Sequence, residues 1–203
     1  KSLLQIRGCT VRFPYQPYNV QVAMMDRVIQ AFKTSQNALL ELPTGSGKSL
    51  GLLCAANAWI ASLGTTSEGE ELIDECNETE TSKRSPPSRL FIASRTHTQI
   101  TQLVRELRKS QYCVKMCILG SRNQYCIDKD VLKAESKGEA CQEKLRENKC
   151  PFIHGAHKLS QHRQLMRGGN LEIHDIEDLV RLGKTVRGCP YFAARGMTKD
   201  SQI

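Results

Sequence analysis

The residues whose types and spacing most clearly suit a chemical role form a glycine-rich turn that ends in Gly47-Lys48-Ser49. An apolar run at 39–42, typical of a strand, precedes the turn, and a helix-compatible segment at 50–62 follows it. Small residues let successive backbone N–H groups point at phosphate oxygens, and the helix N-terminus adds partial positive charge. Lys48 would reach the β- and γ-phosphates, and the Ser49 hydroxyl would bind Mg²⁺. The predicted nucleotide-binding residues of this turn are Pro43, Thr44, Gly45, Ser46, Gly47, Lys48 and Ser49.

One position departs from the usual phosphate-binding pattern, which has glycine where this chain has Leu42. The alternative is a glycine-rich turn that carries Lys-Ser by chance. Because the strand and helix signals both lie where a phosphate loop needs them, the sequence favours ATP and Mg²⁺ as ligands.

Four cysteines form the second group that could do chemistry: Cys126, Cys141, Cys150 and Cys189. The gaps between them are 14, 8 and 38 residues. Zinc sites usually contain two tight cysteine pairs, whereas proline follows two of these four, a context also found in iron–sulfur ligation. Spacing alone leaves zinc, an iron–sulfur cluster and scattered thiols open. The close pair Cys113 and Cys117 is interpreted as core packing, and no role is expected for Cys76.

Charge and cysteine content narrow the class of protein. The chain of 203 residues has nine cysteines and a net charge of +8. Without a secretion signal, an odd cysteine count argues against a disulfide framework. Segment 64–88 holds seven acidic and two basic residues, so the rest of the chain carries +13. We expect this segment to be a disordered insertion. The basic remainder indicates a polyanion such as nucleic acid, or ordinary solubilising charge. The sequence contains no apolar run of about 18 residues, so it predicts no membrane-spanning helix.

Strands and helices alternate in the expected order of elements. An edge strand is expected within 2–11 and a helix over 22–32, ahead of the phosphate loop. After the acidic segment, a strand at 89–93, a helix beyond residue 98 and a strand at 114–119 follow. This alternation predicts an α/β fold with a mostly parallel sheet, in which ligands bind at the carboxyl ends of the strands.

Polar residues follow the expected strand at 89–93. Their hydroxyls, the Arg95 guanidinium and the His97 ring could hold a nucleic-acid backbone. The alternative is that Thr96 or Thr98 caps the following helix. The candidate DNA-binding residues here are Ser94, Arg95, Thr96 and His97.

These motifs together resemble the iron–sulfur (Rad3/XPD-type) superfamily 2 DNA helicases, in order and spacing along essentially the whole chain. Phe13-Pro14-Tyr15 with Gln21 is similar to the family's Q motif. Glu41 to Ser49 resembles motif I, and Ser94 to His97 resembles motif Ia. The segments around the four cysteines, including Arg122 to Ile127 and Cys189 to Arg195, look like the family's iron–sulfur domain.

The resemblance implies a site for each group. Gln21, which alone reads as a surface glutamine, would recognise adenine. Cys126, Cys141, Cys150 and Cys189 would hold a structural [4Fe–4S] cluster, and Arg122 would bind DNA near it. The implied fold is a partial RecA-like first motor domain over 1–120, a small, mostly helical iron–sulfur domain over 121–190, and a return into the motor domain from 191 to 203.

The implied activity is ATP hydrolysis coupled to 5′→3′ movement on single-stranded and forked DNA, in DNA repair within the nucleus, with DNA-repair proteins as partners. The chain stops before the acidic Walker B box and the second motor domain, so we expect little hydrolysis from it alone. Two other functions stay open: a zinc-stabilised nucleic-acid-binding module, and a non-helicase P-loop ATPase.

Overall fold

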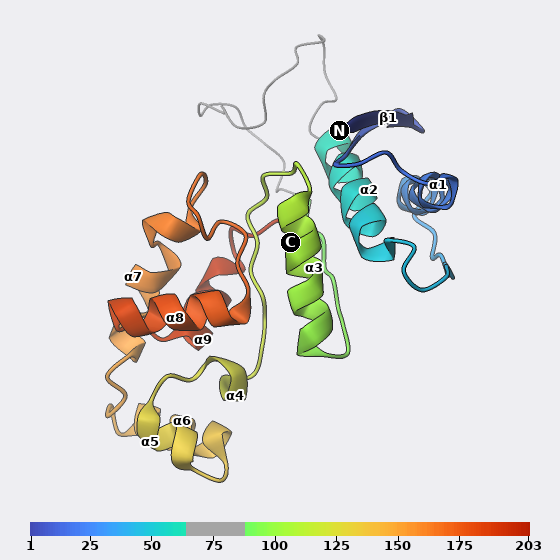
Figure 1. Ribbon diagram of the computed structural model, residues 1–203. Coiled ribbons are helices and arrows are strands. Elements are labelled where there is room, and N and C mark those ends of the chain that lie inside the picture. The colour runs from blue at the N-terminus through green and yellow to red at the C-terminus, as the bar shows by residue number, and fades with distance from the viewer. Residues whose placement is uncertain (64–87) are drawn as a thin grey trace. The chain divides into compact units, whose positions relative to one another are not determined.

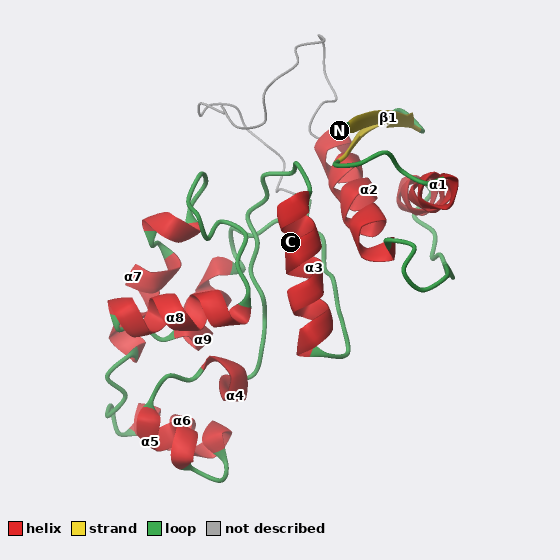
Figure 2. Ribbon diagram, viewed as in Figure 1, coloured by secondary structure: helices red, strands yellow, loops and turns green. Residues whose placement is uncertain are grey.

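The computed structural model describes residues 1–63 and 88–203. It divides into two compact units, residues 1–113 and residues 114–203 (Figure 1). The described residues are mainly helical, and their only strands form one hairpin (Figure 2). None of the helices in this part of the chain is both long and apolar enough to cross a membrane. The acidic insertion predicted at 64–88 lies outside the described residues except for its last residue.

The first unit begins with an antiparallel hairpin of β1 (Ser2–Ile6) and β2 (Cys9–Phe13). The edge strand predicted within 2–11 is therefore two strands. Arg7 and Gly8 both take positive φ angles, 50° and 78°, which is the tight turn whose twist suits a hairpin. Alternate residues of β2 are buried in the core: Cys9, Val11 and Phe13.

Three longer helices complete the first unit: α1 (Asn19–Lys33), α2 (Lys48–Leu63) and α3 (His97–Lys109). The helices predicted over 22–32, over 50–62 and beyond residue 98 are confirmed, with ends a few residues away. Helix α2 packs against α1, β2 and α3. Its central place suits its sequence, because small side chains let neighbouring backbones approach closely: Gly51, Ala55, Ala56 and Ala58 are all buried.

The predicted parallel sheet is absent from the described residues. The apolar segments 39–42, 89–93 and 114–119 contain no regular strand. A β-strand forms only beside a hydrogen-bonded neighbour, and these segments are not paired with one another as strands. Leu39 and Phe91 are accordingly 98% and 86% exposed. The hydrophobic pattern identified these apolar segments as candidate strands, but it could not show which other segments they would pair with.

One short contact in the second unit has the pattern of parallel pairing. The Ile203 N–H donates to the Lys115 carbonyl at 3.2 Å, and the Cys117 N–H donates to the Ile203 carbonyl at 2.9 Å. Two bonds that straddle Met116 in this way are the repeat of a parallel ladder. The segment predicted as a strand at 114–119 therefore runs parallel to the end of the chain over this contact.

The second unit is an assembly of short helices. Tyr125, Leu159 and Leu179 are buried at its centre, and the Tyr125 hydroxyl donates to the Ile118 carbonyl at 2.7 Å. With such short elements, little of the unit's stability can come from helix propensity, and packing must supply the rest. Its helices are α4 (Arg122–Tyr125), α5 (Lys129–Lys133), α6 (Lys137–Arg146), η1 (Ile153–Gly155), α7 (Ala156–Ser160), η2 (Arg163–Leu165), α8 (Ile176–Val186) and α9 (Pro190–Met197).

His174 is a buried titratable group in the loop before α8, and its side chain is 1% exposed. Its Nδ1 lies 3.1 Å from the Leu171 carbonyl, and its Nε2 has no hydrogen-bond partner among the described residues. Burial lowers the pKa of His174, although the Glu172 and Leu171 backbone and the charges of Asp178 and Asp175 oppose this shift. The folded chain therefore favours the neutral His174 ring over the protonated one.

We expect the second unit to lose stability as the pH falls below about 6.5, where His174 gains a proton in the unfolded chain but resists it in the folded one. His174→Asn keeps a donor toward the Leu171 carbonyl and cannot titrate. Denaturant unfolding between pH 7.5 and 5.5 should show a smaller loss of stability on acidification for this variant than for the native chain. Equal losses in both proteins would show that another group controls the acid response.

Candidate nucleotide and metal sites

The glycine-rich turn leads into the N-terminus of α2, as the sequence predicted. Gly45 and Gly47 have φ angles of 77° and 73°, a conformation that glycine adopts without strain. The Lys48 ammonium donates to the carbonyls of Leu42 and Pro43 at 3.0 and 2.9 Å, which holds it at the turn. Most of the turn is exposed, including Gly45 and Gly47, whereas the Ser46 N–H donates to the Pro43 carbonyl at 3.4 Å. The start of α2 beside the exposed glycines is where an anion would bind.

Gln21 is buried against this turn, so the interpretation of it as a surface glutamine is wrong. Its amide nitrogen donates to the Ser46 carbonyl at 2.9 Å, and its amide oxygen accepts from the Tyr18 N–H at 2.9 Å. A Cβ atom on Gly47 would collide with the Gln21 amide. Helix α1 and the turn are thus joined through one side chain. The Ser46 hydroxyl is buried without a hydrogen-bond partner in the part of the chain that the structure describes.

The residues predicted to bind DNA after segment 89–93 lie at the start of α3, and all four are exposed. The Thr96 hydroxyl accepts from the Gln99 N–H at 3.4 Å, so it caps the helix as the alternative interpretation held. The Ser94 hydroxyl donates to the Gln99 side chain at 2.6 Å. Arg95 and His97 remain the side chains of this group that are best placed to meet a polyanion.

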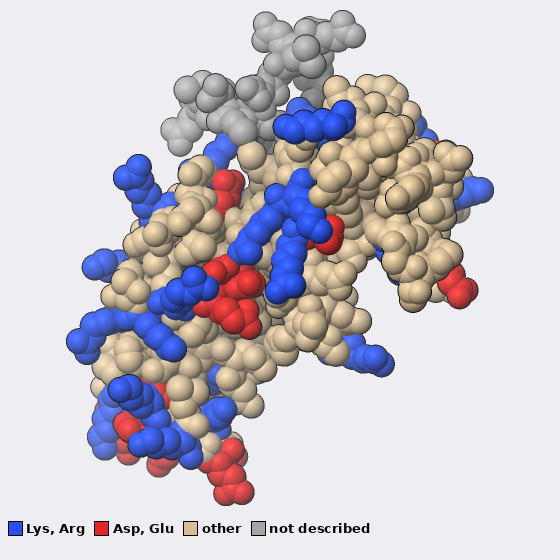
Figure 3. Space-filling view, viewed as in Figure 1, with Lys and Arg blue, Asp and Glu red and all other residues tan. Residues whose placement is uncertain are grey.

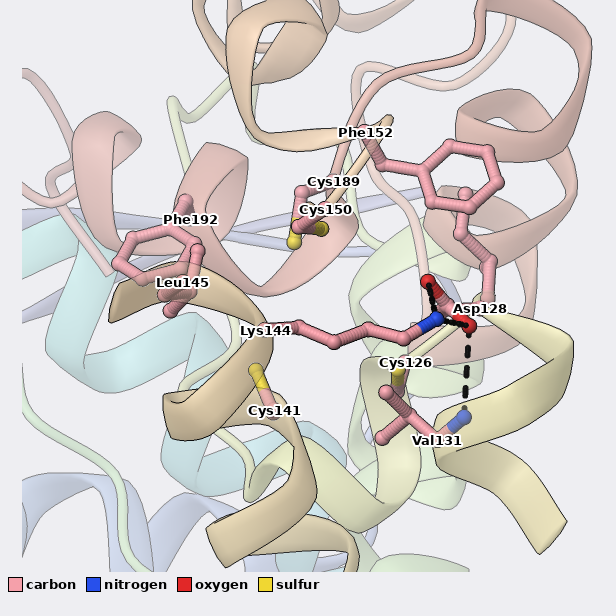
Figure 4. Close-up of a pocket in the computed structure, with 11 residues that line it drawn as sticks. Cys126, Asp128, Val131, Cys141, Lys144, Leu145, Cys150, Phe152, Cys189 and Phe192 are labelled. Atoms are coloured by element: carbon pink, nitrogen blue, oxygen red, sulfur yellow. Dashed lines mark hydrogen bonds and ion pairs between the residues drawn. The ribbon is translucent and has the colours of Figure 1, made fainter. Parts of the chain in front are cut away.

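The structure gathers the four cysteines around one pocket of about 330 Å³, including space open to solvent. Figure 4 shows the Cys150 and Cys189 sulfur atoms close together, with Cys126 and Cys141 at other parts of the pocket lining. Each comes from a different segment: Cys126 ends α4, Cys141 lies in α6, Cys150 precedes η1, and Cys189 precedes α9. Phe152 and Phe192 add apolar walls. Four thiols from four segments therefore share one partly enclosed space.

Backbone N–H groups face two of these sulfur atoms. Burial raises the pKa of Cys126, as do the neighbouring thiols of Cys141 and Cys150, while the Asp128 N–H opposes the shift. Burial likewise raises the pKa of Cys189, and the N–H groups at the start of α9 oppose it. Raised pKa values favour the protonated thiols, so a positive centre would be needed to hold Cys126 and Cys189 as thiolates.

Two glycines allow the segments that carry Cys150 and Cys189 to cross. A Cβ atom on Gly155 would lie 2.8 Å from the Gly188 Cα atom, and one on Gly188 would lie 2.9 Å from the Gly155 carbonyl carbon. Next to this crossing, the Cys189 N–H donates to the Phe152 carbonyl at 2.8 Å. The backbone contact thus fixes where two of the four thiols sit.

The other four cysteines that the structure describes, Cys9, Cys54, Cys113 and Cys117, lie outside the pocket. Cys113 is exposed and Cys117 is half-buried, so the prediction that both are core residues is wrong for Cys113. Cys9 and Cys54 are buried in the first unit, and burial raises the pKa of Cys54 to about 12. Cys76 lies outside the described residues.

Among the described side chains, no group of three or more Cys, His, Asp or Glu is arranged to hold a single metal ion.

Arg122 belongs to an aromatic cluster that the sequence analysis did not assign. Its guanidinium lies 4.6 Å from the centroid of the Tyr191 ring, and that of Arg195 lies 5.5 Å from the same ring. Arg195 also donates to the Tyr191 hydroxyl at 3.2 Å. The Arg122 Nε is buried without a partner among the described residues. The four-residue spacing of Tyr191 and Arg195, about one helical turn, was the signal that could have identified the pair.

Comparison with known proteins gives relatives over nearly the whole chain. The DEAD_2 family model matches residues 92–203. A regulator of telomere elongation helicase 1 homolog from Aedes aegypti is 35% identical over 234 residues, covering 98% of this chain and 23% of the relative. The Arabidopsis thaliana homolog is 37% identical and the Homo sapiens protein 34%, each over 98% of this chain and 20% and 18% of the relative. The chain thus spans about a fifth of the length of these relatives.

Proposed function

Since the chain belongs to the DEAD_2 family of Rad3/XPD-type helicases, we propose that it is the ATP- and DNA-binding part of an iron–sulfur DNA helicase. The parent protein would couple ATP hydrolysis to 5′→3′ movement on single-stranded and forked DNA, in DNA repair within the nucleus. The observation that carries the proposal is that four cysteines line one pocket in a chain that also has a glycine-rich turn ahead of a helix.

Nucleotide binding is assigned to the turn at the start of α2. Its exposed N–H groups and the Lys48 ammonium would meet the phosphates, and the Ser49 hydroxyl would contribute to Mg²⁺ binding. The Gln21 amide uses one donor for Ser46 and one acceptor position for Tyr18. Its second N–H and second oxygen lone pair would bind adenine. Because Gln21 contacts the loop backbone directly, adenine binding and loop position would be linked through it.

The residues of the cysteine pocket fit an iron–sulfur cluster. Four thiols supply the ligand number of a [4Fe–4S] cluster, and the N–H groups facing Cys126 and Cys189 suit sulfur atoms that carry negative charge. In a multi-iron cluster each thiolate binds its own iron, so the thiols need not converge on one point. The cluster would hold together segments of a unit whose helices are too short to pack stably by themselves.

DNA binding is assigned to basic and aromatic side chains in each unit. Lys and Arg side chains are spread over much of the visible face in Figure 3. In the second unit, the half-buried Tyr191 ring lies near the guanidinium groups of Arg122 and Arg195, and the three side chains together would offer aromatic surface and positive charge to a single strand. In the first unit, Arg95 and His97 at the start of α3 would contact the backbone.

A binding experiment with a single-stranded oligonucleotide tests this assignment. We expect Tyr191→Leu and Arg195→Gln each to weaken binding about tenfold, since stacking on an aromatic ring contributes about 1–3 kcal/mol per base. Arg146→Gln, an exposed arginine at the end of α6, removes the same charge and should change binding less than twofold. Affinity should also fall steeply with salt. If Arg195→Gln and Arg146→Gln lowered the affinity equally, net charge alone would explain the loss, and the proposed site would be rejected.

As a finer assignment, we propose the branch of the Fanconi anaemia group J helicase. Its support is Ala23-Met24-Met25 after Gln21, Ala58-Trp59, and His154-Gly155-Ala156-His157-Lys158. In the structure, Met24 and Met25 are buried, and the Trp59 ring stacks on Phe32 at 4.9 Å. These are packing contacts, so they support common descent and say nothing about which DNA is bound.

A further inference from the structure

An ion pair lies in the wall of the cysteine pocket. The Lys144 ammonium donates to both carboxylate oxygens of Asp128, at 2.8 and 2.9 Å (Figure 4). The side chain of Asp128 is 6% exposed and that of Lys144 is 23% exposed. A third contact, to the Asp130 carboxylate at 2.8 Å, reaches a side chain that is 79% exposed and is therefore weakened by water.

Asp128 connects the pair to Cys126. It follows Cys126 by two residues, and its backbone N–H faces the Cys126 sulfur. Its carboxylate accepts the N–H groups of Asp130 and Val131 at 2.9 and 3.3 Å and so caps α5. One residue thus fixes the backbone beside Cys126, the start of α5 and the Lys144 ammonium.

Lys144 connects the pair to Cys141. The two residues are three apart on α6, so they share one face of the helix, and both line the pocket. Helices α5 and α6 pack against each other. The bond from Lys144 to Asp128 therefore ties the helix that carries Cys141 to the segment that carries Cys126.

The charge of the pair also acts on the pocket. Without the Lys144 ammonium, the nearly buried Asp128 carboxylate would keep an uncompensated negative charge beside thiols that bind a metal only as thiolates. With the ammonium in place, the pair adds no net charge to the wall.

From these contacts we propose that Asp128 and Lys144 are positioning residues for the metal centre: their ion pair holds Cys126 and Cys141 facing each other and slows loss of the centre. The inference rests on the proposed function only in requiring that the pocket binds a metal centre. It assigns no ligand role to either side chain.

The test compares rates of metal loss to an excess of chelator in the native chain and in variants of the full chain. Lys144→Met keeps most of the length of the side chain and removes the charge. Asp128→Asn removes the charge but retains a good helix-capping residue. Lys144→Arg keeps a donor. Lys149→Met is the control because it removes an exposed ion pair, with Glu147 at 2.8 Å, from the segment that follows the same helix.

We expect Lys144→Met and Asp128→Asn each to lose the centre about tenfold faster, the low end of the effect of residues that orient metal ligands. The double variant should lose the centre no more than about twofold faster than either single variant, because both changes break the same bond. Lys144→Arg should stay within about threefold of the native rate and Lys149→Met should match it.

Two results would overturn the inference. One is a Lys144→Met chain that loses its metal less than about threefold faster than the native chain. The other is a double variant whose effect is the product of the single effects, which would mean that the two residues act separately. The spectrum of the native chain distinguishes this from failure of the proposed function. Zinc in place of iron would reject the iron–sulfur assignment and leave the rate comparison valid, and a native chain that binds no metal would reject both.

Discussion

Removal of the metal centre will unfold residues 114–203 while residues 1–113 keep their helices. The second unit places its four thiols in four separate segments, and its helices are short, so the bonds to the centre would add to the packing around Tyr125, Leu159 and Leu179. Structural metal sites of this kind contribute about 10 kcal/mol or more, which is comparable with the whole stability of a small domain. Helix α1, helix α2 and the hairpin pack with one another and need no metal.

Cys141→Ser gives the same test without a chelator, because it removes one ligand from the buried face of α6. Hydrogen exchange read by peptide should show loss of protection in the second unit and native protection in the first. Cys117→Ser is the control, since Cys117 is half-buried in the same unit and does not line the pocket. A metal-free chain that keeps full protection over residues 114–203 would contradict a structural role for the centre.

Gly188→Val will destabilise the second unit by more than about 3 kcal/mol and abolish metal binding, because the backbone of η1 passes too close for any side chain. A Cβ atom there would lie 2.9 Å from the Gly155 carbonyl carbon and 2.9 Å from the Leu159 Cβ atom. The neighbouring Cys189 N–H is bonded to the Phe152 carbonyl, so the two segments cannot move apart without displacing two thiols.

A second close contact limits the room for adjustment. A Cβ atom on Gly183 of α8 would lie 2.6 Å from the Pro190 side chain, so α8 packs directly on the start of α9. Gly138→Ala is the matched control, because nothing lies within 4 Å of a Cβ atom at that position in α6. Alanine there should be neutral or stabilising by about 0.5–1 kcal/mol. Thermal unfolding and metal content measure both variants, and a metal-binding Gly188→Val chain of native stability would contradict the crossing.

Local patterns in the sequence predicted the parts of the structure that depend on local chemistry. The periodic apolar residues of α1 and α3 indicated helices, and Gly45 and Gly47 indicated a tight turn ahead of α2. The sheet could not be predicted in the same way. Segments such as 89–93 have strand composition, but pairing depends on neighbours that are remote in the sequence or outside these residues.

The candidate sites show the same division. Cysteine types and spacing named four thiols, and resemblance named them as ligands, but only the structure shows them around one pocket. The contacts of Gln21 with Ser46, of Arg195 with Tyr191, and of Lys144 with Asp128 depend on side-chain geometry. No local pattern in the sequence indicates that Lys144 meets a buried carboxylate across the pocket.

Metal and sulfide analysis of the anaerobically purified chain, with its visible spectrum, tests the central claim most directly. The account predicts a brown protein with about four iron and four sulfide per chain and broad absorption near about 400 nm. It also predicts that this colour is lost when any one of the four pocket cysteines is replaced by serine. A colourless protein that contains zinc, or one that binds no metal with all four cysteines present, would contradict it.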